Sequence, residues 1–150
     1  MAAMVPPFEF DTQLKLEEQV CFPVYALSRL ITKAYQPLLA PLGLTYPQYL
    51  VMLLLWEHQE LAVKAIGRRL LLDTGTLTPL LKLLEQRGLL SRRRDPRDER
   101  SVLIQLLPAG QALHELARAV PAALGQRFSL GPEDVQGLRQ ELRHLITLLS

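Results

Sequence analysis

Apolar residues recur at helical spacing along most of this 150-residue chain. A first helix is predicted over about residues 23–39, where Pro37 should bend or break the last turns because proline lacks a backbone N–H. A second helix opens with a proline in its first turn and covers about 46–58. A short third helix covers about 62–70. The pattern therefore predicts a mainly helical protein.

The best-marked helix begins near position 73. Asp73 or Thr74 can serve as its N-cap, and Gly88 follows it as the residue expected just beyond a helix end. Four leucines fall at i, i+3, i+4 and i+7, namely Leu77, Leu80, Leu81 and Leu84. One face of this helix is therefore predicted to be core and the other polar.

After Gly88 the pattern changes from helical to strand-like. Two short strands, about 89–93 and 101–106, flank a charged turn at 95–98, which predicts a hairpin. A long helix is then expected from about 109 towards 124, disturbed by Pro121, and a last one from about 132. The last helix carries a stripe of leucines at 138, 142, 145 and 149. The predicted fold is mainly α with a small β-hairpin wing, in the order of a winged helix-turn-helix.

Charge is unevenly distributed along the chain. Residues 64–100 hold ten basic and five acidic side chains, so this segment carries +5 in a chain whose total is +2. The remainder is therefore −3. A basic segment in an otherwise slightly acidic protein is typical of proteins that bind a partner with a phosphate backbone. A solvated basic loop is the plainer interpretation.

Several polar residues of the fourth helix and the hairpin are candidates for contacting double-stranded DNA. Threonine can bond phosphate or offer its methyl group to thymine, and lysine and arginine can neutralise phosphate. Asp98 and Arg100 should share one side of a strand, so that the carboxylate can hold the guanidinium towards DNA. The alternative is a solvent-exposed charged face. The candidates are Thr74, Thr76, Thr78, Lys82, Arg92, Arg94, Asp98 and Arg100.

Cys21 is the only cysteine, and Pro23 follows it where a helix would begin. Unpaired N–H groups and the helix dipole at such a start favour the reactive thiolate. A small, inert, buried hydrophobe is the competing interpretation. One cysteine cannot form an internal disulfide, and the apolar runs are too short to cross a bilayer. We therefore expect a cytoplasmic protein without a membrane role.

The three histidines give no metal-ligand spacing with Cys21 or with each other. A Gly-rich phosphate loop and a nucleophile elbow are both missing from the sequence. We therefore expect neither a metal nor a cofactor. A thiol peroxidase would need a route that regenerates the thiol, and the chain has no resolving cysteine, so we expect no enzymatic activity.

Four motifs together resemble the organic hydroperoxide resistance regulators of the MarR family, closely over about residues 14–106 and in general pattern beyond. They are Cys21-Phe22…Tyr25, the stretch 44–49, the stretch 72–81 and Asp98-Glu99-Arg100. The resemblance implies a homodimeric winged-helix repressor that releases DNA when an organic hydroperoxide oxidises Cys21. It also implies that the hydroxyls of Tyr35 and Tyr46 hydrogen-bond the sulfur, in a tyrosine-lined space between the first two helices. Phe22 and Tyr25 are candidate pocket residues, although core packing explains Tyr25 equally well.

In this family interpretation residues 1–150 form one winged helix-turn-helix chain. A DNA-binding lobe covers about 45–106, and dimerisation helices cover about 12–40 and 108–150. A two-fold dimer would place its recognition helices roughly 34 Å apart and contact an inverted-repeat operator. Without a second cysteine, oxidised Cys21 would react with a low-molecular-weight thiol, a backbone nitrogen or more peroxide. A regulator released by a small aromatic ligand, with no cysteine oxidation, is the alternative.

Overall fold

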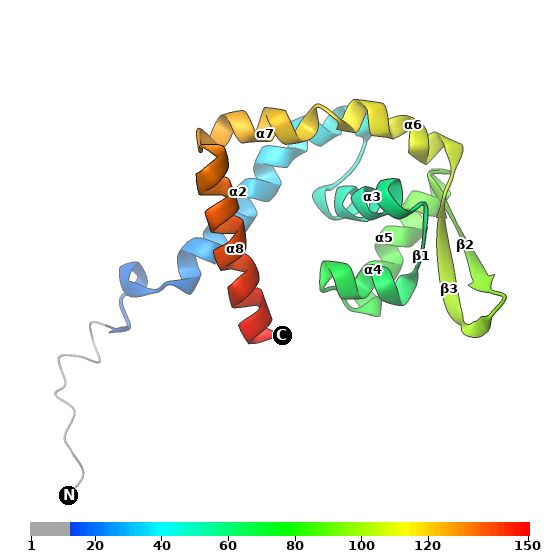
Figure 1. Ribbon diagram of the computed structural model, residues 1–150, viewed down its shortest axis with the longest axis horizontal. Coiled ribbons are helices and arrows are strands. Elements are labelled where there is room, and N and C mark those ends of the chain that lie inside the picture. The colour runs from blue at the N-terminus through cyan, green and yellow to red at the C-terminus, as the bar shows by residue number, and fades with distance from the viewer. Residues whose placement is uncertain (1–12) are drawn as a thin grey trace, which may run out of the picture.

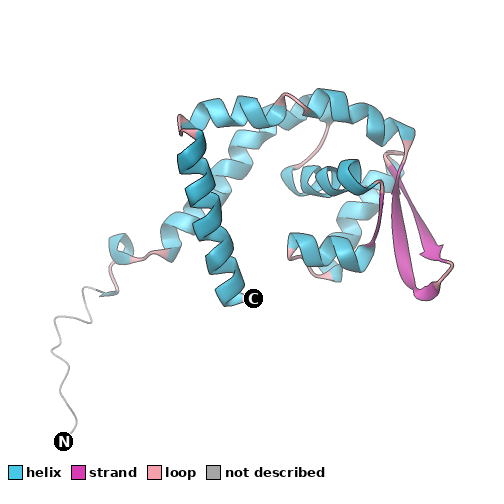
Figure 2. Ribbon diagram, in the orientation of Figure 1, coloured by secondary structure: helices cyan, strands magenta, loops and turns pink. Residues whose placement is uncertain are grey.

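Long helices frame a small lobe that carries a β-hairpin, in a computed structural model that describes residues 13–150 (Figures 1 and 2). The chain runs through the 3-10 turn η1 (Leu16–Glu18), helix α2 (Cys21–Leu39), the 3-10 turn η2 (Ala40–Leu42), α3 (Tyr46–His58), β1 (Glu60–Ala62), α4 (Val63–Leu70), α5 (Thr74–Gln86), β2 (Leu90–Asp95), β3 (Asp98–Leu106), α6 (Pro108–Ala117), α7 (Val120–Phe128) and α8 (Pro132–Leu149). In Figure 1, α3 to α5 and the sheet form the lobe, and α8 descends apart from it. The fold is mainly α with a small winged hairpin, as predicted.

The sheet has three antiparallel strands in the order β1-β3-β2. Leu90 pairs with Leu106 and Arg92 with Ile104, and the register shifts between Arg94 and Asp95 near the tip. The predicted hairpin is confirmed. Strand β1, which pairs Leu61 with Ile104, was not predicted, because three residues are too few to show a strand pattern.

Local capping bonds explain where the two central helices begin and end. At α3, the N–H of Gln48 donates to the Thr45 hydroxyl and the N–H of Thr45 donates to the Gln48 side chain, so both members of a capping box are present. Helix α5 ends with the N–H groups of Gly88 and Leu89 donating to Glu85 and Leu84, a Schellman arrangement. Gly88 has φ +71°, which glycine adopts readily. The predicted bounds of both helices are therefore confirmed.

Two prolines act differently from each other. Pro37 was expected to bend or break the first helix, but α2 continues through it to Leu39 and passes directly into η2. Pro37 therefore does not break α2. The helix predicted over 109–124 is divided into α6 and α7, and Pro121 lies in the first turn of α7, where its missing N–H has no cost.

One continuous core holds the lobe together. It includes Leu55 of α3, Ile66 of α4, Leu81 of α5 and Ile104 of β3, each at most 1% exposed. The same cluster extends to Leu39, Leu42 and Leu44 before α3 and to Ala117 and Val120 after the sheet. The end of α2 and the α6–α7 junction are therefore packed into the lobe.

The two outer segments of the chain bury almost none of their apolar side chains. Helix α8 has no buried residue, and its predicted leucine stripe is exposed. In the first half of α2, Phe22, Val24, Leu27 and Leu30 are exposed as well. We call α8 and residues 21–30 the arms.

Within residues 13–150 no single helix is long and apolar enough to cross a membrane; only the bent pair 21–42 and 46–58, angled by 62°, meets that criterion jointly.

Candidate functional site

Helix α5 begins at a well-defined cap. The Asp73 carboxylate accepts the N–H of Thr76 at 2.7 Å. Hydrogen bonds from the backbone and side chain of Thr76 hold the pKa of Asp73 below its usual value. Asp73 is therefore the N-cap, and its negative charge lies at the positive end of the helix.

The polar candidates on α5 lie outside the core. Thr74, Thr76 and Lys82 are exposed and Thr78 is half-buried, while Leu77 and Leu81 on the other face are buried. Because Thr74, Thr78 and Lys82 follow each other at intervals of four, they form one strip along the helix. This strip is free to contact a macromolecule.

The arginines of the wing divide into two groups. Arg92 forms an ion pair with Glu85 of α5, and Arg93 forms one with Glu60 of β1 at 2.8 Å. Both are therefore tied to the body of the lobe. Over residues 13–150, no acidic side chain forms an ion pair with Arg94, Arg97 or Arg100, all of which are exposed.

Asp98 does not hold the guanidinium of Arg100 as expected. Its carboxylate instead accepts the backbone N–H of Arg100 at 3.1 Å, and Asp95 accepts the N–H of Arg97 at 2.9 Å. These bonds between residues two apart stabilise the turn, as Asp commonly does. The two aspartates therefore shape the wing tip, while the Arg100 side chain extends from it.

A groove of about 190 Å³ lies between the wing and the helices. It brings together Thr74, Thr78, Arg92 and Arg100 from the predicted set. It also includes Lys64 and Ser101, which the sequence analysis did not single out. Both could have been predicted from the order of the elements, because a winged helix-turn-helix places the first turn of α4 beside the hairpin.

The thiol lies at the start of α2. Cys21 is its first residue, so the predicted position at a helix start is confirmed, and the thiol is exposed in the single chain. Phe22 and Tyr25 beside it are 42% and 61% exposed, and the Arg29 guanidinium lies 5.7 Å from the Tyr25 ring centre. Within one chain these aromatic residues do not enclose the sulfur.

Three tyrosines cluster at the other end of α2. The ring centres of Tyr35 and Tyr46 are 4.5 Å apart and stacked, and Tyr49 lies 5.7 Å from Tyr35 and 6.4 Å from Tyr46. Burial, with repulsion from Tyr46 and Tyr49, raises the pKa of Tyr35 to about 12, and burial raises the pKa of Tyr46. At neutral pH these phenols keep their protons and can donate hydrogen bonds. Tyr49 was not among the candidate site residues.

The structure separates the thiol from the tyrosines within one chain. Cys21 and Tyr35 lie fourteen positions apart on one continuous helix, which corresponds to about 21 Å along its axis. Within one chain, the structure therefore does not bring Cys21 into the tyrosine-lined space that the family resemblance implies. Since α2 is continuous, the two groups stay apart within one chain.

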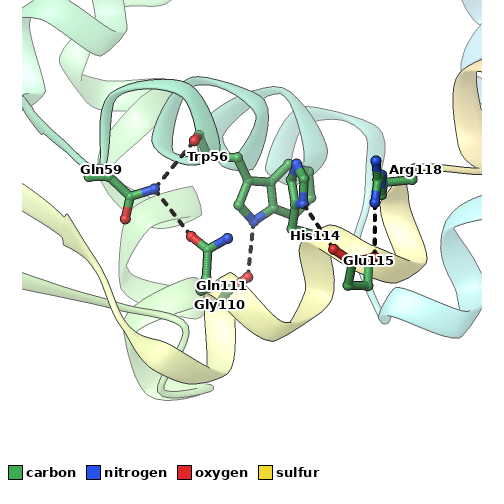
Figure 3. A network of polar contacts seen from close by, with 7 residues as sticks. All are labelled: Trp56, Gln59, Gly110, Gln111, His114, Glu115 and Arg118. Atoms are coloured by element: carbon green, nitrogen blue, oxygen red, sulfur yellow. Dashed lines mark hydrogen bonds and ion pairs between the residues drawn. The ribbon is translucent and has the colours of Figure 1, made fainter.

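An aromatic junction joins the lobe to α6 (Figure 3). The indole N–H of Trp56 donates to the Gly110 carbonyl at 3.0 Å, and the Gln59 side chain donates to Trp56 and Gln111. The Trp56 ring also lies 6.3 Å from Tyr49 and 5.7 Å from His114. This junction was not predicted from the sequence, because Trp56 and Gln59 lie more than fifty positions from Gly110 and Gln111. His114 here is a packing residue, and no three metal-ligating side chains converge within 13–150.

Comparisons with known proteins place this architecture in a defined class. The MarR family model matches residues 44–102. The organic hydroperoxide resistance transcriptional regulator of Bacillus subtilis is 50% identical over 141 residues, which cover 94% of this chain and 95% of that protein. The chain is thus similar, over nearly its whole length, to a transcriptional regulator.

AbfR of Staphylococcus epidermidis is similar in both sequence and structure. Its reduced form bound to DNA has 38% sequence identity and a TM-score of 0.75, with 93% of this chain and 97% of that chain covered. Its overoxidized form bound to DNA also gives 0.75, whereas its disulfide form gives 0.63 at 39% identity and 93% and 98% coverage. The protein is a winged-helix transcriptional regulator. It belongs to the MarR family.

Proposed function

We propose that this chain is a dimeric cytoplasmic repressor that binds an inverted-repeat operator and releases it when an organic hydroperoxide oxidises Cys21. The observation that carries the proposal is an exposed, solitary thiol at the first turn of α2 in a chain so similar to a hydroperoxide resistance regulator. The DNA-bound structures of AbfR support the same interpretation of the lobe.

In this proposal, residues of about 45–106 bind DNA, and the helical segments of about 12–40 and 108–150 form the dimer. Position 12 lies outside the described residues. The exposed apolar arms support the division, because unpartnered leucines on α8 and α2 can bury their surface against a second copy. We assign the operator contacts to the strip on α5 and to Arg94 and Arg100 of the wing, with Asp98 shaping the tip.

We further propose that Tyr35 and Tyr46 hydrogen-bond the sulfur of Cys21 across the dimer. The separation of about 21 Å within one chain supports this arrangement, because a second copy can bring its α2 start to the tyrosine cluster. The raised pKa of Tyr35 and of Tyr46 keeps both phenols protonated and able to donate. Phe22 and Tyr25 would then line an apolar entrance for the peroxide.

The proposed reaction consumes one peroxide for each thiol. The sulfur attacks the peroxide, the O–O bond breaks, a sulfenic acid forms, and the alcohol leaves with a proton. A low-molecular-weight thiol then displaces water and forms a mixed disulfide. Because overoxidized AbfR is found on DNA, we favour this bulky adduct over further oxygen addition as the releasing product. We assign Cys21 a stoichiometric role as a sensor, without enzymatic turnover.

The test uses an operator duplex selected from random sequence by the reduced protein. Binding is measured by fluorescence anisotropy before and after one equivalent of cumene hydroperoxide, with and without free cysteine, and intact mass spectrometry identifies the product. We expect release by the wild type and no release by Cys21→Ser. Equal release by both proteins would sink the proposal. A phenolic acid that releases both, and raises Tm, would support the aromatic-ligand alternative.

The DNA interface is tested separately through the salt dependence of binding. Arg94→Ala should reduce the slope of log K against log salt by about one, because one phosphate contact is lost. Arg92→Ala is the matched control, since its guanidinium is already paired with Glu85. An equal change of slope in both variants would contradict the assignment.

A further inference from the structure

Arg87 connects the end of α5 to the loop that precedes Tyr46. Its guanidinium donates to the carbonyl oxygen of Gly43 and, at 3.0 Å, to that of Leu42. The two ends of this contact lie more than forty positions apart in the chain. The Arg87 side chain therefore joins α5, which is the recognition helix of the winged helix-turn-helix, to the segment that leads into the tyrosine cluster.

The loop side of the contact is closely packed. Leu42 and Gly43 end the turn η2, where carbonyl oxygens have no partner further along the helix. Gly43 has φ +64°, and a Cβ atom there would lie 2.8 Å from a guanidinium nitrogen of Arg87. Leu42 and Leu44 are buried, so movement of this loop is transmitted to the core and to Arg87.

The same loop leads directly into the tyrosine cluster formed by Tyr35, Tyr46 and Tyr49. Thr45 caps α3, and Tyr46 is the first residue of that helix, stacked on Tyr35. The reciprocal bonds between Thr45 and Gln48 hold this start in place. The Tyr46 ring is therefore connected to Gly43 through two consecutive backbone residues, which are fixed by the core and by the cap.

The helix side of the contact is held in place as well. Arg87 follows the last residue of α5, and its N–H donates to Leu83. The bonds from Gly88 and Leu89 close the helix end around it. The DNA-facing residues begin at Thr74, thirteen positions away and about 20 Å along the axis, so Arg87 is not placed to contact the same phosphates.

We propose that Arg87 is a positioning residue that couples the tyrosine cluster to the recognition helix. Through two parallel hydrogen bonds, a shift of Tyr46 moves the C-terminal end of α5 and changes the angle at which its other end meets DNA. This inference rests on the proposed function, because it requires that oxidation at Cys21 disturbs Tyr46. A planar guanidinium can hold two carbonyl groups at once, which a lysine ammonium does less well.

The test compares wild type, Arg87→Lys and Arg87→Gln, with Arg127→Gln as a control that removes one exposed charge from α7. Each variant is checked for folding by circular dichroism. Operator affinity is then measured for the reduced and the fully oxidised protein, and the ratio of the two dissociation constants is the readout. Mass spectrometry measures the oxidation of Cys21 in each variant.

We expect the wild-type ratio to fall roughly three- to thirtyfold in Arg87→Gln and by less in Arg87→Lys, with Cys21 oxidised equally in all variants. Arg127→Gln should keep the wild-type ratio. A merely structural role would lower Tm and leave the ratio unchanged, and that result overturns the inference. If Arg87→Gln does not fold, the same criterion is applied to Arg87→Lys. Failure of the wild type to release DNA would instead overturn the proposed function.

Discussion

The lobe and the arms contain similar apolar residues but bury them very differently. Leu81 of the lobe is 1% exposed, whereas Leu142 of α8 is 38% exposed. Both occupy regular positions on the apolar face of an amphipathic helix, and the sequence patterns look alike. Helical spacing thus identifies an apolar face without telling which partner covers it. In the lobe the partner is the same chain, and in the arms we assign that place to a second copy.

The largest expected effect is the loss of unfolding free energy when a buried leucine of the lobe is truncated, compared with an equivalent leucine of the arms. Leu81→Ala should lower the free energy of unfolding by about 3 kcal/mol, because it removes buried methyl groups and leaves a cavity. The matched change Leu142→Ala should cost less than about 1 kcal/mol in dilute protein. Urea unfolding at several protein concentrations checks both values. Equal losses at every concentration would mean that α8 packs within its own chain.

A charge in the apolar stripe of α8 should act mainly on assembly. Leu145→Glu should raise the dissociation constant of the dimer roughly 10- to 100-fold, about 1.4 to 2.7 kcal/mol, because the carboxylate would have to be buried. Gln140→Glu adds the same charge on the polar side and should have little effect. Sedimentation velocity measures the association. If Leu145→Glu leaves the dissociation constant of the dimer unchanged, α8 is not part of the interface.

Substitutions at the helix starts should reveal a smaller difference in stability between the lobe and the arms. Asp73→Ala should destabilise the lobe, because the cap bond to Thr76 is lost. Glu133→Ala in the first turn of α8 removes a charge but no cap bond, and should cost about 0.3 kcal/mol. Thermal unfolding of both variants measures the difference.

The Asp73 contribution also depends on pH with a definite sign. Because the pKa of Asp73 is lowered in the fold, its contribution is present above the unfolded value of 3.8 and is lost as pH falls through the folded pKa. The free energy of unfolding of Asp73→Ala should therefore decline less steeply in acid than that of the wild type. Parallel acid profiles would contradict the assigned cap.

The last prediction concerns the titration of Tyr35, which lies where α2 passes from arm to lobe and which affects stability only in alkaline solution. Its pKa is raised to about 12, so the folded protein keeps a proton that the unfolded chain loses at 10.0. The stability that this provides is complete below pH 10 and disappears as pH rises towards 12. Tyr35→Phe should flatten the fall in unfolding free energy over that interval. An unchanged alkaline profile would show that Tyr35 is not the group responsible.

Features that depend on near neighbours were predicted well. The bounds of α3 and α5, the hairpin turn and the helix start at Cys21 each follow from caps, prolines or alternation within a few residues. Strand β1 was missed because it exists only through its pairing with β3. The break that Pro37 could have caused is absent from α2, which continues to the buried Leu39.

The candidate site shows the same limit at the level of side chains. The sequence placed Arg92 and Arg94 together as phosphate contacts, but only folding revealed that Glu85 already holds Arg92. Asp98 was matched with the Arg100 guanidinium and instead bonds the backbone. Charge and spacing list possible partners, and packing selects among them.

The amino-acid sequence alone determined the helical faces, the caps, the basic segment and the solitary thiol, because each depends on composition or on residues within about one helical turn. Only the tertiary structure decided that Tyr46 and Tyr49 of α3 gather around Tyr35 of α2, and that Arg87 reaches the carbonyl groups of Leu42 and Gly43. These relations join residues distant in the chain, and they arise when the buried faces of the helices pack into one core.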